Sequence, residues 1–262
     1  MMEKFFVGLH QVRLVKHFDR ACVSINALRR PGGIRKSPVP VSPGAEILLD
    51  SGAFTELARH GGYRHSVFQY ANAVRRALPL FGCQVTVVSQ DWMCEPFMLE
   101  RTGLSVIEHQ KRTIARYDAL LAEEIPAPIL PVLQGYDPTD YARHVREYGD
   151  RLAPGAWVGV GSVCKRNSRP LEIIEVLWAI HQERPDLRMH GFGVKTTALL
   201  EPAVRHLLYS ADSMAWSYAA RREQSGRQND WREAERFRLR VEGVAGRPID
   251  AWQPGLPLEA AA

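Results

Sequence analysis

The chain has 262 residues, which corresponds to one large domain or two small ones. Hydrophobic residues make up 45% and charged residues 24% of it, so the composition is that of a folded globular protein and excludes wholesale disorder. No apolar run approaches the roughly 18 residues of a membrane-spanning helix. The net charge of +5 is compatible with a phosphate-bearing partner.

Short apolar runs alternate with helical patterns along the chain, and the runs are near-continuous, as in parallel strands buried on both faces. The predicted elements, in chain order, are strands at 5–9, 22–26 and 46–50, a helix at 66–80, a strand at 85–89, a helix at 105–124, a strand at 129–134, a helix at 138–152, a strand at 157–161, a helix at 170–183, a strand at 188–193, a helix at 196–208 and a weaker strand at 210–214.

Several local signals mark these boundaries. Ser105 and Glu108 have the spacing of a capping box, and Pro138 and Pro170 stand where a helix tolerates proline in its first turn. The connection 28–43 contains Pro-Gly-Gly and is predicted to be a long loop. After residue 217 the pattern is helical to about residue 241 and then irregular.

Eight strands alternating with helices in about 215 residues predict an α/β protein with a single (β/α)8 TIM barrel. We expect residues 1–217 to form the barrel and residues 218–262 to form a C-terminal helix and an irregular tail that pack on it. An open doubly wound sheet is the alternative fold.

Cysteine usage indicates the compartment. The four cysteines are scattered, form no C-x-x-C pair and show no metal-ligand spacing with histidine; they are Cys22, Cys83, Cys94 and Cys164. The first residues lack the apolar stretch of a signal peptide. We therefore expect a cytoplasmic protein with no membrane association, no metal and no cofactor.

Polar side chains gather where the predicted strands end, which is where the chemistry of such barrels lies. Asp50, Asp91 and Asp212 each follow or interrupt an apolar run, and Gln134 ends another. A single strand-end aspartate could simply cap the next helix, but three around one rim favour a functional site because a buried carboxylate is costly. His10 and Asn26, at the first two strand ends, are interpreted as structural polar residues.

Glycines accompany these polar residues. Gly52 and Gly135 follow Asp50 and Gln134, and further glycines stand at two later strand ends, namely Gly159, Gly161, Gly191 and Gly193. Bare backbone suits the close approach of a flat ligand such as a nucleobase. For the pair Gly191 and Gly193 alone, a simple fit to the tapering barrel is the preferred interpretation.

Two segments are rich in basic residues. The 28–43 loop carries four, which are Arg29, Arg30, Arg35 and Lys36, and we expect them to contact nucleic-acid phosphates. The arginines after residue 220 alternate with acidic residues, so a solvated, salt-bridged face is at least as good an interpretation there.

The strand-end motifs also carry a resemblance to a known family. The DSGAF segment at 50–54 resembles the D-S-G-G-F signature of the tRNA-guanine transglycosylases. Further segments resemble that family's motifs in the same order: SQD at 89–91, PVLQG at 131–135, VGVGS at 158–162, HGFG at 190–193 and ADS at 211–213. The QDWMCEP segment at 90–96 and EHQ at 108–110 are similar to the short phage and bacterial branch, the DNA 7-deazaguanine transglycosylases, often called DpdA.

The resemblance, which covers about residues 5–217, implies a role for each matched residue. Asp212 matches the catalytic nucleophile and Asp50 the catalytic acid and base. The matched substrate-binding residues are Asp91, Gln134, Gly135, Gly161, Ser51, Gly52, Phe54, Gly191 and Gly193. The implied reaction is a pentosyl transfer that exchanges guanine in DNA for a free 7-deazaguanine base (preQ0-like) through a covalent aspartyl-deoxyribose intermediate, so DNA, that base and guanine are the expected partners.

The sequence departs from the tRNA enzymes in three ways, one of which is that the nucleophile segment reads DSMAW at 212–216 and lacks their following P-T-R. No cysteine follows Cys164, so their C-x-C-x-x-C…H zinc site is absent, and Ala53 stands where they have a second glycine. A tRNA-guanine transglycosylase of the queuosine type remains an alternative, as does a non-catalytic nucleic-acid-binding barrel. Lys195 as a Schiff-base lysine and Cys94 as a nucleophile are minor alternatives, and monomer and homodimer both remain open.

Overall fold

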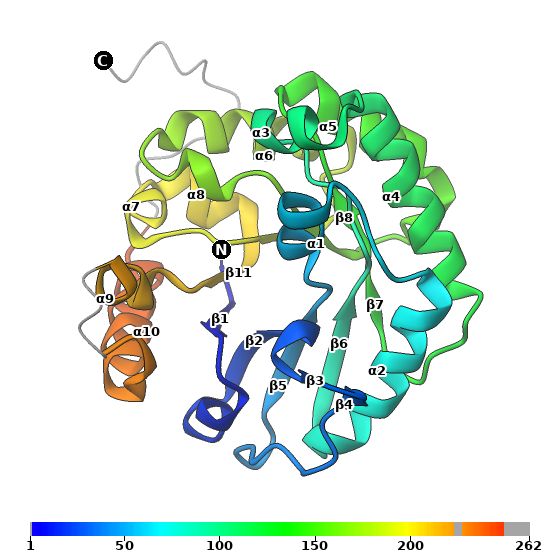
Figure 1. Cartoon of the computed structure of the whole chain (residues 1–262). Helices are drawn as coiled ribbons and strands as arrows, with labels where there is room; N and C mark the ends of the chain where they lie inside the picture. The colour runs from blue at the N-terminus through cyan, green and yellow to red at the C-terminus, as the bar shows by residue number, and fades with distance from the viewer. Residues whose placement is uncertain (1, 223–226, 249–262) are drawn as a thin grey trace.

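A computed structural model of the chain describes residues 2–222 and 227–248, which form a barrel of parallel strands surrounded by helices (Figure 1). The barrel strands are β1 (Lys4–Leu9), β2 (Arg20–Ser24), β5 (Glu46–Asp50), β6 (Gln84–Val88), β7 (Ile129–Leu130), β8 (Val132–Leu133), β9 (Trp157–Val160), β10 (Arg188–Gly191) and β11 (Leu208–Ser213). Their order around the sheet is β7-β6-β5-β2-β1-β11-β10-β9-β8. All eight predicted strands are therefore present.

The two ends of this sheet belong to one stretch of chain, because only Pro131 separates β7 from β8. β7 pairs with β6 and β8 pairs with β9, and the Gly159 amide donates to the Pro131 carbonyl oxygen at 2.8 Å. Proline has no N–H to offer the ladder, so the fifth strand is interrupted at this residue. The predicted (β/α)8 barrel is confirmed, with its fifth strand in two parts.

The helices lie outside the strands (Figure 1). They are α1 (Ala53–His60), α2 (Val67–Phe81), α3 (Pro96–Thr102), α4 (Val106–Leu121), α5 (Pro138–Tyr148), α6 (Pro170–Glu183), α7 (Thr196–Leu199), α8 (Pro202–Leu207), α9 (Tyr218–Arg222) and α10 (Trp231–Ala245). The predictions of α2, α4, α5 and α6 are confirmed, and the capping box of Ser105 with Glu108 is present. The short helices α1 and α3 were not predicted.

Three predicted elements need correction. The 28–43 connection contains a small antiparallel hairpin, β3 (Arg29–Arg30) with β4 (Gly33–Ile34). The helix expected over 196–208 is two helices, because Pro202 starts α8 and cannot continue the hydrogen bonds of α7. The helix expected from residue 218 to about 241 is divided into α9 and α10, and Asp230 caps the start of α10.

The apolar core has two layers. Inside the barrel, six buried side chains fill the space below the strand ends: Phe6, Cys22, Leu48, Val88, Leu130 and Val132. A larger layer lies between the strands and the surrounding helices. These six side chains fill the barrel interior, so an open space at the carboxyl ends of the strands has an apolar floor.

The segment after the barrel packs against its first strand. The ring of Phe237 in α10 lies 6.0 Å from that of Phe5 in β1, and Ala234, Val241 and Val244 are buried on the same helix. The expected irregular tail at 249–262 lies outside the described residues. Within the described ranges, no helix combines the length and the apolar character that crossing a membrane requires.

Candidate active site

A cavity of about 490 Å³ opens at the carboxyl ends of the barrel strands. This size falls in the range of roughly 300–1,000 Å³ that is typical of small-molecule sites. Seven of the residues expected from the sequence line it together: Asp50, Phe54, Asp91, Gln134, Gly161, Gly193 and Asp212. The three strand-end aspartates therefore share one cavity, although they are 162 positions apart from first to last in the chain (212 − 50).

Asp212 lies in β11 next to the first strand, in register with Phe6. Its Oδ1 accepts a hydrogen bond of 3.1 Å from the Gly193 amide and lies 3.4 Å from Nε2 of His190. Gly193 has φ +66°, and a Cβ there would lie 2.7 Å from the Cβ of Cys164. Glycine is thus required for the tight turn that aims this amide at the Asp212 carboxylate.

His190 is a site residue that the sequence reasoning did not assign. It is fully buried in β10, and its Nδ1 lies 3.0 Å from the hydroxyl of Ser210, which also accepts a 2.8 Å hydrogen bond from the indole of Trp157. Since Ser210 Oγ accepts from Trp157, it can donate its own proton to Nδ1. His190 then carries its proton on Nε2, facing the Asp212 carboxylate.

Asp50 is the last residue of β5, and its Oδ2 accepts a 3.0 Å hydrogen bond from the Gly52 amide. Burial, together with the negative charge of Asp212, raises the pKa of Asp50 to about 6, against the hydrogen bonds from Gly52 and Ser24. A carboxyl group with this pKa can both donate and accept a proton near neutral pH.

Asp91 and Gln134 face each other in the cavity, and Gln134 Nε2 donates a short hydrogen bond to Asp91 Oδ2. Burial raises the pKa of Asp91 to about 7, with a further contribution from the charge of Asp50. Gly161 lies directly over Gln134, since a Cβ at Gly161 would lie 2.1 Å from Nε2. The absence of a side chain at Gly161 therefore leaves room for the Gln134 amide.

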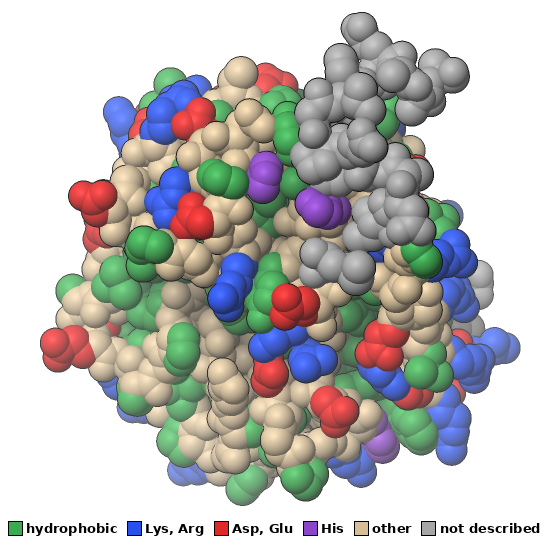
Figure 2. All heavy atoms as spheres, turned by 180° about the vertical axis from the view of Figure 1, so that it is seen from behind, with side chains coloured by type: hydrophobic (Ala, Val, Ile, Leu, Met, Phe, Trp, Pro, Cys, Tyr) green, Lys and Arg blue, Asp and Glu red, His purple; other side chains and the backbone are tan. Residues whose placement is uncertain are grey.

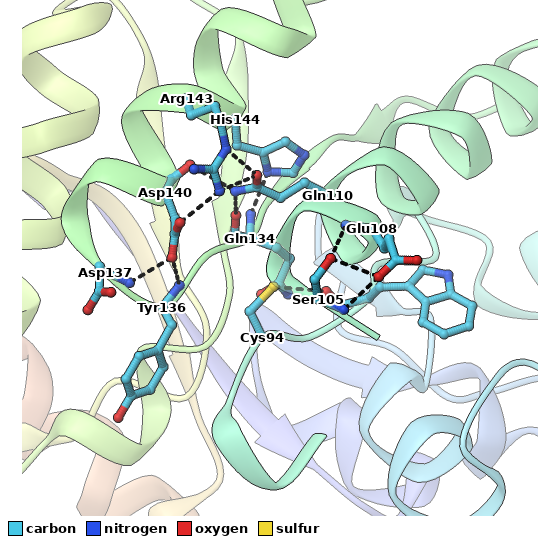
Figure 3. Close-up of polar contacts among 11 residues, drawn as sticks. Cys94, Ser105, Glu108, Gln110, Gln134, Tyr136, Asp137, Asp140, Arg143 and His144 are labelled. Carbon is cyan, nitrogen blue, oxygen red and sulfur yellow. Dashed lines mark hydrogen bonds and ion pairs between the residues drawn. The ribbon is translucent and has the colours of Figure 1, made fainter. Parts of the chain in front are cut away.

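A buried network holds Gln134 from behind (Figure 3). The backbone N–H of Gln134 donates to Nδ1 of His144 at 2.9 Å, and Gln110 Nε2 donates to the backbone carbonyl oxygen of Gln134 at 2.7 Å. Arg143 in turn donates to Gln110 Oε1 and to Asp140. Burial lowers the pKa of His144 to about 3, so the ring stays neutral and can accept. The backbone of Gln134 is thus held in place by side chains of α4 and α5.

Ser162 and Glu95 also belong to the site, and neither was predicted. Ser162 has a left-handed φ of +57°, rare for a residue with a side chain, and its Oγ lies 2.8 Å from Gln134 Oε1 and 2.9 Å from Glu95 Oε2. Ser162 Oγ also accepts from the Cys94 amide at 2.9 Å. The Ser162 hydroxyl can donate to Glu95 or to Gln134 Oε1, and burial raises the pKa of Glu95 against the hydrogen bond from Ser162.

The remaining predicted residues support the site without lining the cavity. Ser51 is buried, Gly52 starts α1 with φ +81°, and a Cβ on Gly135 would contact Asp140 and Tyr141. A Cβ on Gly191 would meet Val194 and Leu208 in the outer core layer. These four residues act on the cavity only through the backbone and the neighbours that they position.

The four basic residues of the 28–43 connection lie on and beside the β3–β4 hairpin, outside the cavity lining. The Arg30 guanidinium donates to the carbonyl oxygens of Ala27 and Arg29, and Arg35 donates to the hydroxyl of Ser37 at 2.7 Å. On the face seen in Figure 2, basic side chains are interspersed with acidic ones. A role of the hairpin in phosphate binding stays a prediction.

The minor alternatives fit the geometry poorly. Cys94 is fully buried, and burial raises the pKa of its thiol far above neutral, so it is not a poised nucleophile. Lys195 is exposed outside the cavity lining, where its ammonium group lies 5.7 Å from the ring of Tyr218. Within residues 2–222 and 227–248, no three His, Cys, Asp or Glu side chains form a group that could hold a metal ion.

Comparison with known proteins places the chain in a family. The sequence profile of the family described as "DpdA: DeoxyPurine in DNA protein A" matches residues 1–233, which is most of the chain. No curated protein matches the sequence. The match includes every element that lines the cavity, from β1 to β11. The chain therefore belongs to the DpdA family of DNA-modification proteins, transglycosylase-type enzymes related to the tRNA-guanine transglycosylases.

Proposed function

We propose that this protein exchanges guanine in DNA for a free 7-deazaguanine base through a covalent aspartyl-deoxyribose intermediate. The observation that carries the proposal is the meeting of Asp212, Asp50 and Asp91 in one cavity. A protein that only bound phosphates would gain nothing from carboxylates there, whereas base exchange with retention at C1′ needs one carboxylate as nucleophile and one as acid and base.

In the first displacement, an Asp212 carboxylate oxygen attacks C1′ of the target deoxyguanosine. The bond between C1′ and N9 breaks, its electron pair goes to the departing guanine, and protonated Asp50 donates a proton to that base. The hydrogen bond from the Gly193 amide and the facing Nε2 of His190 orient the attacking carboxylate. The product of this step is an ester between Asp212 and C1′ of the deoxyribose.

In the second displacement, the incoming base replaces Asp212. Ionised Asp50 removes the proton from N9 of the 7-deazaguanine, N9 attacks C1′ from the face that guanine left, and the ester bond breaks to return the carboxylate of Asp212. Two inversions restore the original configuration at C1′. The raised pKa of about 6 suits Asp50 for both roles near neutral pH.

Base recognition is assigned to Asp91, Gln134 and the backbone of Gly161. The Asp91 carboxylate can accept hydrogen bonds from the N–H edge of a guanine-like base, and the Gln134 amide can donate and accept. Both side chains are buried and fixed by neighbours before any ligand arrives, which lowers the ordering cost of binding. The aromatic ring of Phe192 lines the same cavity and offers an apolar surface for the base.

The target nucleotide must reach a cavity at the end of a barrel, so it has to leave the base stack or be single-stranded. We assign the basic residues of the β3–β4 hairpin to backbone phosphates, as the sequence predicts. Neutralising Arg29, Arg30, Arg35 and Lys36 together should weaken DNA binding and flatten its salt dependence. An unchanged slope would remove this hairpin from the interface.

The decisive experiment incubates the protein with labelled guanine and either duplex DNA or tRNA. Label in DNA supports the proposal, label in tRNA indicates the queuosine-type activity, and binding without label indicates a non-catalytic binder. Denaturing electrophoresis of a reaction with DNA should reveal the covalent adduct. An adduct that persists in Asp212→Ala would refute the assigned nucleophile. The half-buried Asp118 lies in α4 outside the cavity lining, so Asp118→Ala is a matched control that should keep the adduct.

A further inference from the structure

A second cavity of about 440 Å³ adjoins the first and shares Phe54 and Ser162 with it. Three aromatic and three basic side chains give it its character: Phe54, Phe97, Tyr136, Lys165, Arg166 and Arg169. We call these six residues the aromatic–basic groove. Its two phenylalanines stand in the first turns of α1 and α3, and Figure 1 shows where these two helices lie beyond the strands. The groove therefore leads from the proposed base site to the outside.

The two phenylalanines of the groove are unusually exposed. Phe54 and Phe97 are 50% and 40% accessible, and their ring centroids lie 6.1 Å apart. Each is the second residue of its helix, so its ring projects from the helix start and not toward the core. Two large exposed aromatic rings beside one another at the mouth of a cavity are typical of a binding surface.

Lys165 supplies the available positive charge. Its ammonium nitrogen lies 6.0 Å from the ring of Phe54 and 5.9 Å from that of Phe97, and within the described ranges no carboxylate forms an ion pair with it. Arg169, by contrast, pairs with Glu172 at 2.5 Å. Lys165 is thus exposed between two rings, where an anionic ligand can reach it, although its charge also acts on the buried Glu95 and lowers the pKa of that carboxyl group.

Arg166 and Glu95 form the fixed wall and floor of the groove. The guanidinium of Arg166 lies 4.6 Å over the ring of Tyr136 and donates to the Tyr136 carbonyl oxygen, so this arginine is buried and rigid. The carboxyl group of Glu95 is buried and hydrogen-bonded to Ser162. The groove consequently presents aromatic faces and positive charge, with its one buried acid turned toward the base site.

We propose that the aromatic–basic groove binds the DNA strand next to the extruded nucleotide, with a neighbouring base on Phe97 and Phe54 and a phosphate on Lys165. This inference rests on the proposed function in taking DNA as the substrate. A strand whose nucleotide enters the barrel must leave the cavity mouth along the surface. Aromatic platforms combined with cations are how proteins hold single strands without reading sequence, because every base has a flat face and every nucleotide a phosphate.

The test measures DNA binding by fluorescence anisotropy over a series of salt concentrations, with a labelled single strand that contains one guanine. The variants are Phe97→Ala and Lys165→Gln, and the controls are Leu121→Ala, an exposed apolar residue at the end of α4, and Arg188→Gln, an exposed cation at the start of β10. We expect about tenfold weaker binding for Phe97→Ala, because a stacked base loses its platform, and about tenfold for Lys165→Gln, because a phosphate loses its cation. Lys165→Gln should also reduce the salt slope by about 0.7.

Two further measurements separate this inference from the proposed function. Binding of free guanine, followed by calorimetry, should be the same in the groove variants and the unmodified protein, because the base site is intact. If the unmodified protein exchanges guanine and both groove variants bind DNA as it does, the groove inference is overturned and the exchange reaction stands. Groove-dependent DNA binding without exchange would support the groove and refute the reaction, and a protein that binds no DNA refutes both.

Discussion

Replacing Gly161 by alanine tests the base-recognition site with a single methyl group. The added Cβ would lie 2.1 Å from Nε2 and 2.6 Å from Cδ of Gln134, whereas ordinary contacts begin at 3.4 Å. The Gln134 amide must therefore move by about 1 Å or more, because carbon and nitrogen atoms cannot approach so closely. It has no free direction, as Asp91 and Ser162 hold its two ends and α4 and α5 hold its backbone.

The cost follows from the contacts that are lost. A neutral hydrogen bond such as that between Ser162 and Gln134 contributes about 1 kcal/mol, and the bond to a carboxylate such as Asp91 contributes about 1.5–3 kcal/mol. Losing both destabilises the folded protein by about 3 kcal/mol. The displaced Gln134 would also lose the two hydrogen bonds that we propose it makes to the base, which at about 1 kcal/mol each amount to roughly thirtyfold in kcat/KM for the free base. Overpacking should also lower the melting temperature, since an extra methyl group in a filled core costs about 1–3 kcal/mol.

The assay is the initial rate of labelled guanine entering DNA, measured as the guanine concentration varies. Gly243→Ala is the matched control, because nothing lies within 4 Å of a Cβ at that position in α10. It should leave the exchange rate unchanged and stabilise the helix slightly. A folded Gly161→Ala protein with the unmodified kcat/KM for guanine would show that Gln134 takes no part in recognition.

Three further predictions concern the carboxylates and their neighbours. The first displacement needs Asp50 protonated and Asp91 ionised. With pKa values of about 6 and about 7, the plot of kcat/KM for DNA against pH should therefore be bell-shaped, with its maximum between these values. Asp91→Asn should remove the acidic limb, and a flat profile would contradict these roles. The folded protein also holds the Asp91 proton more tightly than the unfolded chain, so the free energy of unfolding should fall as pH rises from about 4 to about 7. Asp91→Asn should therefore melt roughly 5 °C higher than the unmodified protein at pH 8 and no higher at pH 4. Calorimetry at the two pH values checks this. His190→Phe keeps a ring in the same space but removes the Nε2 atom that faces Asp212. Adduct formation in single-turnover experiments should therefore slow about tenfold, while the KM for DNA stays the same. An unchanged rate would limit His190 to a role in packing.

Much of the barrel could be predicted from local pattern. The eight strands are near-continuous apolar runs, and Ser105 and Pro170 mark helix starts by chemistry that acts within a few residues. The sequence pattern does not predict the short helices α1 and α3, because each is only about two turns long and begins in a motif segment that we interpret as functional. Pro202 is a local signal for a break in the helix expected over 196–208, because proline cannot continue the hydrogen bonds of a helix.

The candidate site also contains some residues that local sequence patterns reveal and others that only the fold brings together. Asp50, Asp91 and Asp212 could be found because polar residues at strand ends interrupt apolar runs. His190 offered a subtler signal, since Gly191 faces the outer layer and alternation then turns His190 into the barrel toward Asp212. Glu95 offers no such signal in the sequence, because its partner Ser162 lies 67 positions away and only the fold brings the two residues together.

The pairing of the first strand with the last has a consequence for how the protein is made. Residues 4–7 of β1 find their partners only at residues 210–213 of β11, so the contact spans nearly the whole barrel and is among the costliest in loop entropy. Asp212 lies within that closing segment. A nascent chain therefore carries Asp50 and Asp91 long before Asp212, the nucleophile that we propose, and we expect no reaction with DNA until β11 has left the ribosome and joined β1.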